Sequence, residues 1–373
     1  MIRRIVVAAA LLACLLSGCS DQRILERLGF LHTASYDLIP VENKHMEDQL
    51  EVSVTYPVID AQLRKVKYEV FSATAQTSKE AKMKISRKSE LSLVNGQLRS
   101  TLFGLSIAKK GLWEYIDTLV RDPSISQRVK ITVVNGNANE LLKKKYPSHQ
   151  STGQYIDRML EKEVRSNNVP EITIYEFARD YFDDGIDVIV PIIKDQGVDI
   201  VVDGIALFEG DQYKTKLDAE QAIYFAFLRD SFKQGDISID LSEVGLRGEY
   251  IFSTLSSKRE LNVKRDSSGA REVEIAVDIR GSVLEYTGDL QLSDHEEKER
   301  LEKLVSHYIS RKLNAIIKKM QKYKVDSIGV GKHVRNSMTY SDWIKLDWNR
   351  LYPQTKIQTN VHVTIKDYGK FER

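Results

Sequence analysis

The most regular pattern of apolar positions lies in the last third of the chain. Between residues 294 and 323, apolar side chains such as Leu301, Tyr308, Leu313 and Met320 recur every three or four positions, which is typical of one face of an α-helix. The first turn is acidic and the last turn is basic, as the helix dipole favours. Ser293 and Glu296 have the spacing of a capping box. The pattern predicts a long amphipathic helix over 294–323.

Alternating patterns lie on both sides of this helix. Val273, Ile275, Val277 and Ile279 alternate with polar residues, and apolar residues alternate again over 357–365. Strict alternation predicts strands with one buried face, and we expect these two strands to lie side by side. Residues 266–269, a polar stretch that ends in glycine, are expected to form a turn.

Shorter β-like and helical runs are interleaved over the first two thirds of the chain. We predict strands at 51–56, 67–71 and 129–134, and helices at 77–89, at 106–120 with a break at Gly111, and at 152–164. Residues 198–217 are expected to form a hairpin that turns at 209–211, followed by a helix that starts at Asp218 and Gln221. Two further strands are predicted at 237–241 and 249–254.

Together these elements predict an α+β (mixed α/β) fold with mixed or antiparallel sheets. The 373 residues, of which 42% are hydrophobic, are enough for several domains with cores of their own. We expect three: an N-terminal mixed α/β domain over 19–194, a small middle α+β domain over 195–265, and a C-terminal α+β domain over 266–373 that is built around the long helix.

The first nineteen residues predict that the protein is exported and where it is located. Arg3 and Arg4 precede twelve uncharged residues, which as a helix would span only about 18 Å of a hydrocarbon core about 30 Å thick. The stretch is therefore expected to be a signal peptide over 1–18, and Leu16-Ser17-Gly18-Cys19 has the form that a lipoprotein signal peptidase recognises. We expect Cys19 to carry diacylglycerol at the outer face of a membrane. The alternative is an ordinary signal peptide with a chance cysteine.

Charge and cysteine content exclude or disfavour several classes of function. Removal of 1–18 takes away Arg3 and Arg4 and leaves 53 basic against 53 acidic residues, so net charge favours neither nucleic-acid binding nor broad adhesion to an anionic membrane. The only cysteines are Cys14 and Cys19, which excludes a disulfide or a thiolate metal site in the folded body.

Several stretches approach a catalytic or metal-binding motif without completing it. Gly329-Val330-Gly331-Lys332 lacks the first glycine and the final Ser or Thr of a phosphate-binding loop, so we interpret it as a tight turn between helix and strand. His295-Glu296 lacks the second histidine of a metalloprotease. Asp183, Asp184 and Asp187 around Gly185 could bind a hard cation, but solvated carboxylates are the simpler interpretation. We therefore predict no catalytic residues, metal or cofactor.

Two tryptophans stand close together near the C-terminus. Trp343 and Trp348 are five residues apart, a spacing that most often belongs to the edge of a core. Trp is also enriched at protein interfaces, so the two residues are also candidates for a partner interface.

Several stretches along the chain match one known family in sequence and in order. They are Cys19 with 21–30, 104–111, 117–121, 203–208, and Asp326, Gly329, Gly331, Arg335, Trp343, Trp348, Tyr352-Pro353 and Gly369. In these residues and their order, the chain resembles the Ger(x)C spore germination lipoproteins. The resemblance covers essentially the whole mature chain. Ser20 and Leu351-Tyr352-Pro353 depart from the commoner family pattern, which bears on the subgroup and not on the anchor.

The resemblance implies a C subunit of a nutrient germinant receptor. Such a protein has three domains of mixed α and β structure, lies on the outer surface of the spore inner membrane, and acts with two integral membrane subunits, A and B. The family is not known as enzymatic, and the one functional residue that the resemblance transfers is Cys19. Two alternatives remain: a solute-binding lipoprotein of a transport system, which usually has two lobes of similar size, and an extracytoplasmic hydrolase.

Overall fold

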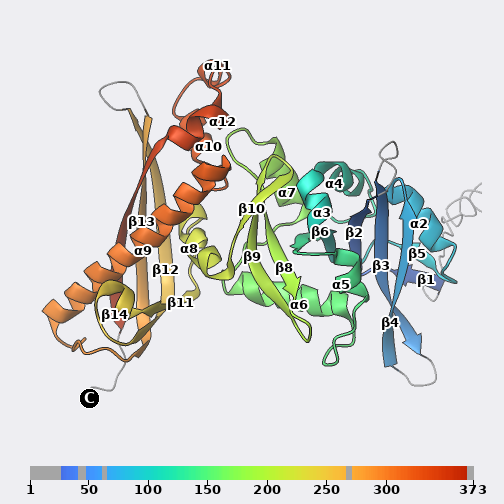
Figure 1. Cartoon of the computed structure of the whole chain (residues 1–373), viewed down its shortest axis with the longest axis horizontal. Coiled ribbons are helices and arrows are strands. Elements are labelled where there is room, and N and C mark those ends of the chain that lie inside the picture. Colours follow the sequence, from blue (N-terminus) through green and yellow to red (C-terminus); the bar gives the residue numbers. More distant parts are fainter. Residues whose placement is uncertain (1–26, 41–47, 61–64, 266–270, 368–373) are drawn as a thin grey trace, which may run out of the picture.

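The computed structural model describes residues 27–40, 48–60, 65–265 and 271–367. Two β-sheets lie towards opposite ends of an elongated molecule, and α8 (Ala219–Arg229) lies between them (Figure 1). The predicted signal peptide, Cys19 and the turn predicted at 266–269 lie outside the described residues.

The larger sheet has eight strands in the order β10-β9-β8-β7-β6-β2-β3-β4. Its central strands β8, β7, β6 and β2 run parallel, and an antiparallel pair of strands extends each edge. The strands are β2 (Thr33–Ile39), β3 (Gln49–Asp60), β4 (Lys65–Ala75), β6 (Ser100–Gly104), β7 (Lys130–Val134), β8 (Ile189–Asp195), β9 (Ile200–Glu209) and β10 (Gln212–Leu217). A separate parallel pair joins β1 (Leu28–Phe30) to β5 (Ser92–Val94).

Helices cover both faces of the larger sheet, because its central strands are apolar on both sides. Leu102 and Val134 pack with α5 (Ala138–Lys143) and α6 (Thr152–Arg165). Their chain neighbours Phe103 and Val133 point to the opposite face. That face belongs to the core that includes α2 (Ser78–Ser86), α3 (Leu105–Lys110), α4 (Trp113–Val120) and α7 (Ile174–Phe182). The predicted break at Gly111 is confirmed, since α3 ends before it and α4 begins after it.

The smaller sheet has the order β11-β12-β13-β14, and β13 and β14 run parallel. Its strands are β11 (Gly235–Asp240), β12 (Glu249–Arg265), β13 (Arg271–Tyr286) and β14 (Lys356–Asp367), with the 3₁₀ turn η2 (Leu241–Val244) after β11. Val273, Ile275, Val277 and Ile279 are at most 1% exposed. The predicted alternating strands are therefore confirmed, and they are neighbours as expected.

The long helix α9 (His295–Tyr323) lies across the buried face of the smaller sheet (Figure 1). Its predicted span is confirmed to within one residue, but its predicted cap is wrong. Asp294, and not Ser293, caps the helix, because its carboxylate accepts hydrogen bonds from the backbone N–H groups of Glu296 and Glu297 at 2.9 and 3.0 Å. A charged acceptor interacts with the helix dipole more strongly than a hydroxyl does.

The predicted middle domain, 195–265, contributes to both sheets. Its first two strands, β9 and β10, extend the larger sheet, whereas β11 and β12 belong to the smaller one. The sheets therefore do not divide the chain at residues 194 and 265. The sequence pattern shows which residues form strands, but the partner of each strand depends on long-range pairing that the pattern does not contain.

Candidate functional site

The residues of the C-terminal motif meet the larger sheet at one surface, which we call the junction. It consists of residues 180–187, Arg229, Arg259, residues 326–335 and Trp348. The stretch Gly329–Lys332 leads here into the short helix α10 (Val330–Asn336), so the predicted turn into a strand is wrong. The chain turns helical at this point because the carboxylate of Asp326 accepts hydrogen bonds from the first backbone N–H groups of α10.

Two glycines bring the backbones of the two regions into contact. Lys332 donates its backbone N–H to the carbonyl of Gly185, 2.9 Å away. A Cβ atom on Gly331 would lie 2.5 Å from Nε1 of Trp348 and 2.7 Å from Cα of Gly185, and one on Gly185 would lie 2.5 Å from the carbonyl carbon of Gly331. Gly185 also has a φ of +87°, which favours glycine. Only glycines allow this approach.

The carboxylate of Asp326 is the centre of the junction. It is 3% exposed and accepts hydrogen bonds from the backbone N–H groups of Val330 and Gly331, at 2.9 and 2.6 Å, and from Nε1 of Trp348 at 3.0 Å. Burial raises the pKa of Asp326 to about 7, although the three hydrogen-bond donors act to lower it.

Asp187 connects the larger sheet to the same centre. Its carboxylate accepts the backbone N–H of Asp326 at 2.6 Å and that of Gly210 at 3.2 Å. Its own backbone N–H donates to the carbonyl of Asp326 at 3.0 Å. Burial raises the pKa of Asp187 to about 6. Asp187 thus holds Asp326 from one side while α10 and Trp348 hold it from the other.

The three acidic residues that could have bound a cation have partners within the chain: Asp183 has basic side chains, Asp187 has backbone donors, and Asp184 accepts the hydroxyl of Tyr340 at 3.3 Å. Asp183 pairs with Lys332 at 2.9 Å and with Arg335 at 2.7 Å. Burial alone would raise the pKa of Asp183, but these two cations hold it below its ordinary value. Within the described residues, no group of three or more His, Cys, Asp or Glu side chains is placed to hold a metal ion.

Two arginines tie α8 and the smaller sheet into the junction. Arg229 donates to the carbonyl of Ser327 and to the carboxylate of Asp180, both at 2.6 Å. Arg259, on β12, donates to the carbonyl of Ile328 at 3.4 Å. The junction therefore joins both sheets and α8 through charged hydrogen bonds, which are stronger than neutral ones.

The two tryptophans are buried inside this chain. Trp343, in α11 (Tyr340–Trp343), is 6% exposed, and Trp348, in α12 (Trp348–Leu351), is 8% exposed. Their ring centres are 5.9 Å apart, and the ring of Trp348 lies 5.8 Å from that of Tyr352, in η3 (Tyr352–Gln354). A partner could reach only a small part of either ring.

Acidification is expected to stabilise the junction. Asp326 and Asp187 have raised pKa values in the folded protein, near 7 and 6, so between about pH 4 and pH 7 the folded state binds more protons than the unfolded state. The stabilisation is fully present below about pH 4 and is lost as the pH rises to 7.

Asp326→Asn removes one of these two titrating groups. We expect urea unfolding to show that the free energy of unfolding of the wild type, relative to that of this variant, grows by about 2 kcal/mol between pH 7.5 and pH 5. A difference that does not change with pH would contradict the raised pKa of Asp326.

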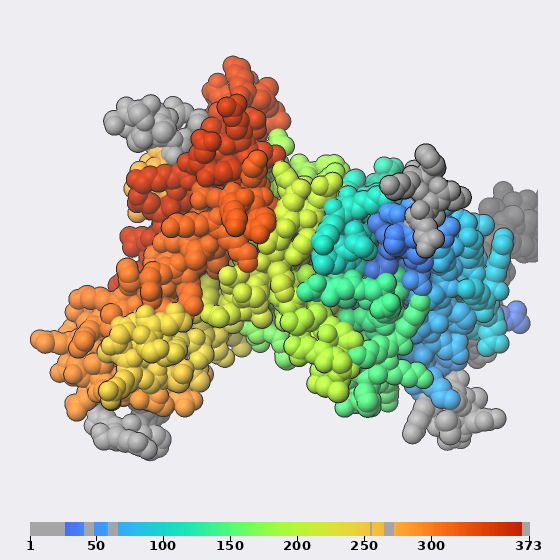
Figure 2. All heavy atoms as spheres, in the orientation of Figure 1, coloured from blue at the N-terminus to red at the C-terminus, as the bar shows by residue number. Residues whose placement is uncertain are grey.

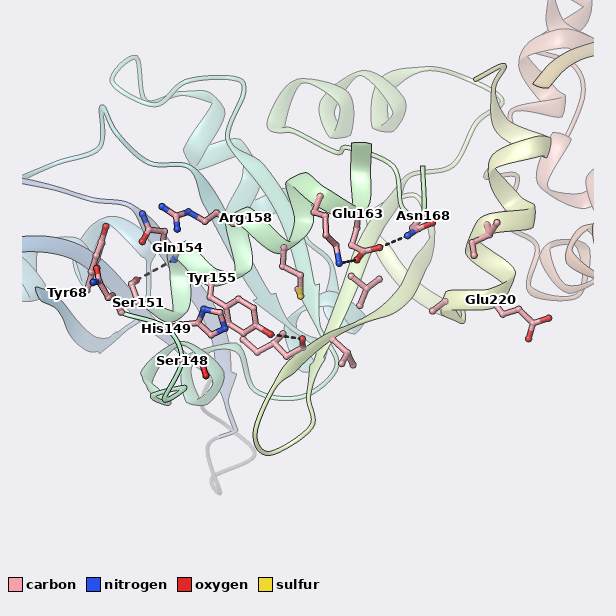
Figure 3. A pocket seen from close by; sticks show the side chains of 18 of the residues that line it. Tyr68, Ser148, His149, Ser151, Gln154, Tyr155, Arg158, Glu163, Asn168 and Glu220 are labelled. Atoms are coloured by element: carbon pink, nitrogen blue, oxygen red, sulfur yellow. Dashed lines mark hydrogen bonds and ion pairs between the residues drawn. The ribbon is translucent and has the colours of Figure 1, made fainter. Parts of the chain in front are cut away.

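A groove of about 1190 Å³ follows α6, between the outer part of β4, strand β9 and α8 (Figure 3). His149 and Tyr155 stack at one side of it, with ring centres 3.6 Å apart, and the hydroxyl of Tyr155 donates to the carbonyl of Ile200. Arg158 is exposed in the same groove and has no ion pair among the described residues.

The polar groups of the groove are suited to binding and not to proton transfer. Glu163 accepts hydrogen bonds from Asn168 and Lys162, both at 2.6 Å. Burial opposes ionisation, but these donors hold the pKa of Glu163 below its ordinary value, so the carboxylate is charged at neutral pH. Stacked rings, an amide and a guanidinium can hold a ligand or a protein segment.

The structure brings together residues that the sequence presented separately. The junction contains Asp183, Asp187, Gly329–Lys332 and Trp348. Arg229 and Arg259 could not be predicted as parts of the junction, because their positions in a helix and a strand give no sign of their partners. The groove could not be predicted either, because its walls come from segments between residues 66 and 238.

Comparisons with known proteins agree with this structure. Residues 21–195 match the family described as the spore germination protein N-terminal domain, and residues 203–369 match the family described as spore germination B3/GerAC like, C-terminal. The spore germination protein GerQC of Bacillus cereus is 26% identical over 369 residues, which cover 97% of this chain and 98% of GerQC. The first match ends with β8 and the second begins within β9, so the boundary between them falls inside the larger sheet.

The fold also matches a solved structure. The crystal structure of the GerBC protein aligns with a TM-score of 0.59 at 15% identity, over 89% of this chain and 97% of that chain. This likeness confirms a mixed α/β architecture with mixed and antiparallel sheets. The two family matches cover the chain from residue 21 to residue 369 with a gap of seven residues. The chain belongs to the Ger(x)C family of spore germination proteins, and this membership supports a role as a germinant receptor subunit.

Proposed function

We propose that this chain is the C subunit of a nutrient germinant receptor, anchored by lipid on Cys19 to the outer face of the spore inner membrane. In this role it assembles with two integral membrane subunits, A and B, and acts by binding and not by catalysis. The observation that carries the proposal is the family match over both halves of the chain.

The structure supports this role by the kind of sites it contains. The junction is a set of hydrogen bonds and ion pairs that holds the two sheets together, and the groove is a binding surface. The two sheets have eight and four strands, which differs from the two similar lobes of a typical solute-binding lipoprotein. A folded body with an accessible groove is suited to a subunit that contacts partners.

The proposed anchor accounts for membrane attachment in physical terms. No helix in the described ranges is both long enough and apolar enough to cross a bilayer. A diacylglycerol group places two acyl chains in the bilayer, and each buried methylene contributes about 0.8 kcal/mol, so two chains anchor a protein stably where one does not.

Replacement of Cys19 by alanine is expected to release the protein from spore membranes and to impair germination in response to nutrient. The variant cannot carry the lipid, so the chain would have no stable anchor of its own. Membrane fractionation after a high-salt wash, which removes electrostatic contacts with lipid headgroups, and a germination assay measure the two effects. Cys14→Ala is the matched control, because Cys14 lies in the segment that is removed and should leave both unchanged. A Cys19→Ala protein that stays in the membrane fraction and responds fully would refute the anchor.

A further inference from the structure

One face of α9 carries a line of exposed basic residues, which we call the basic stripe. Its members are Arg300, Lys303, His307, Arg311, Lys318 and Lys322, and all six side chains are exposed. Steps of three, four and seven residues place them on one side of the helix, over a length of about 33 Å. After Glu299, the only acidic residue in the helix is Glu302, which lies on another side.

The other sides of α9 are occupied by contacts within the chain. Leu301, Ile309 and Leu313 are buried against the smaller sheet. Glu302 and Ser306 accept the backbone N–H groups of Ile365 and Val363 on β14, at 2.7 and 3.0 Å. The basic stripe lies on the remaining face, and Figure 2 shows α9 (orange) uncovered along the surface of the molecule.

Two more lysines of α9 form ion pairs or hydrogen bonds within the chain. Lys312 pairs with Glu220 and Glu243, at 3.2 and 3.4 Å, and Lys319 donates to the side chain of Gln221 at 2.9 Å. They fix α8 and η2 to the long helix. Apart from Arg311, the basic residues of α9 that contact α8 and η2 are therefore separate from those of the basic stripe.

The basic stripe has few counter-charges. Lys303 pairs with Glu299 on the same helix, and Arg311 donates to the backbone carbonyl of Glu243. For Arg300, Lys318 and Lys322, the described part of the chain contains no ion pair. Repulsion among these cations is not balanced within the chain, so the structure favours an anionic surface outside it.

The open face of the smaller sheet shows the opposite arrangement. Three of its lysines are paired with glutamates: Lys258 with Glu260, Lys264 with Glu274, and Lys356 with Glu272, at 2.5 to 2.7 Å. That face is also exposed and rich in lysine, but these three lysines lie beside acidic side chains that neutralise them. Unpaired charge of one sign is thus a property of the basic stripe and not of exposed surface in general.

We propose that the basic stripe binds the headgroups of anionic phospholipids and lays α9 along the membrane surface. The contact is electrostatic and superficial, because the stripe carries cations and no large apolar side chain that would insert. A straight line of like charges suits an extended planar array of phosphates. The balanced net charge of the chain does not oppose such binding, since charges beyond about 10 Å are screened at physiological salt.

The proposal also orients the molecule on the membrane. It rests on the proposed lipid anchor for its location, and residues 19–27 span at most about 30 Å before β1. In Figure 1, β1 and α9 lie towards opposite ends of the long axis. Attachment at Cys19 and at the basic stripe therefore holds the long axis along the bilayer and leaves the far side of the molecule free for partners.

The test uses the mature chain from residue 20 without lipid and vesicles of phosphatidylcholine alone or mixed with phosphatidylglycerol. We expect co-sedimentation with the anionic vesicles only, and loss of binding at high ionic strength. Replacing Arg300, Lys303, Lys318 and Lys322 together by glutamine should weaken binding roughly tenfold to a hundredfold.

The matched control replaces Lys258, Lys264, Lys356 and Lys366, on the open face of the smaller sheet, by glutamine. It removes the same number of charges and should bind anionic vesicles as the wild type does. The proposal is wrong if the wild type does not bind these vesicles, as expected if an acidic protein were the partner, or if both variants bind equally well. Because the chain carries no lipid in this assay, its outcome is independent of the anchor at Cys19.

Discussion

Replacement of Gly331 by alanine is expected to destabilise the protein by about 2–4 kcal/mol, because the added Cβ overpacks the junction against backbone atoms that cannot move aside. Position 331 lies within a helix, where alanine is ordinarily more stable than glycine by about 0.5–1 kcal/mol. Helix propensity thus predicts that Gly331→Ala stabilises the protein, whereas the close contacts of the junction predict that it destabilises it. The close distances to Gly185 and Trp348 decide for destabilisation.

Urea or thermal unfolding measures this effect. Gly96→Ala is the matched control, since a Cβ at Gly96 would meet no atom within 4 Å, and it should be neutral or slightly stabilising. Equal stability of the Gly331 variant and the control would show that the two backbones do not approach as closely as the structure indicates.

Asp326→Ala should be more damaging, with a loss of about 3–5 kcal/mol. The substitution removes the acceptor of two backbone N–H groups and of the indole N–H, and each buried donor without a partner costs about 1–3 kcal/mol. Asp326→Asn keeps one oxygen in place and is expected to lose less. The free energies of unfolding of the two variants are measured in urea near neutral pH.

A double-mutant cycle isolates the bond to the indole. Trp348→Phe removes the donor, so the loss from Asp326→Ala should be smaller in that background than in the wild type. Additive effects would show that Asp326 and Trp348 do not interact in solution, and a loss below about 1 kcal/mol for Asp326→Ala would contradict its central place in the junction.

The junction explains why the C-terminal residues that carry the family resemblance are spaced as they are. Asp326 accepts backbone N–H groups of α10, Gly331 allows contact with Gly185, Arg335 pairs with Asp183, and Trp348 donates to Asp326. Each of these residues makes a contact within the chain. They hold two sheets in one arrangement, which is what a subunit that works through contacts requires.

Local features of the fold could be predicted because they depend on nearby residues. The span of α9 followed from the period of its apolar face, and the strands around Val277 and Val363 followed from alternation. The break at Gly111 followed from the glycine itself. The cap of α9 was misassigned by one residue because Ser293 and Asp294 are both good capping residues, and only the backbone geometry selects between them.

Features that depend on distant pairing could not be predicted. Nothing in the sequence indicates that β9 and β10 extend the larger sheet, or that Arg229 and Asp180 meet across 49 positions. The basic stripe was present in the sequence as evenly spaced cations, but only the packed helix shows which lysines serve α8 and which remain exposed.

The most direct test of the proposed function is purification of the lipid-anchored protein from spore membranes after mild crosslinking, followed by identification of the proteins that accompany it. We expect two polytopic membrane proteins, the A and B subunits, to be recovered with the wild type and lost with Cys19→Ala. Recovery of the anchored wild type alone, or only with the components of a solute transporter, would contradict the proposed function.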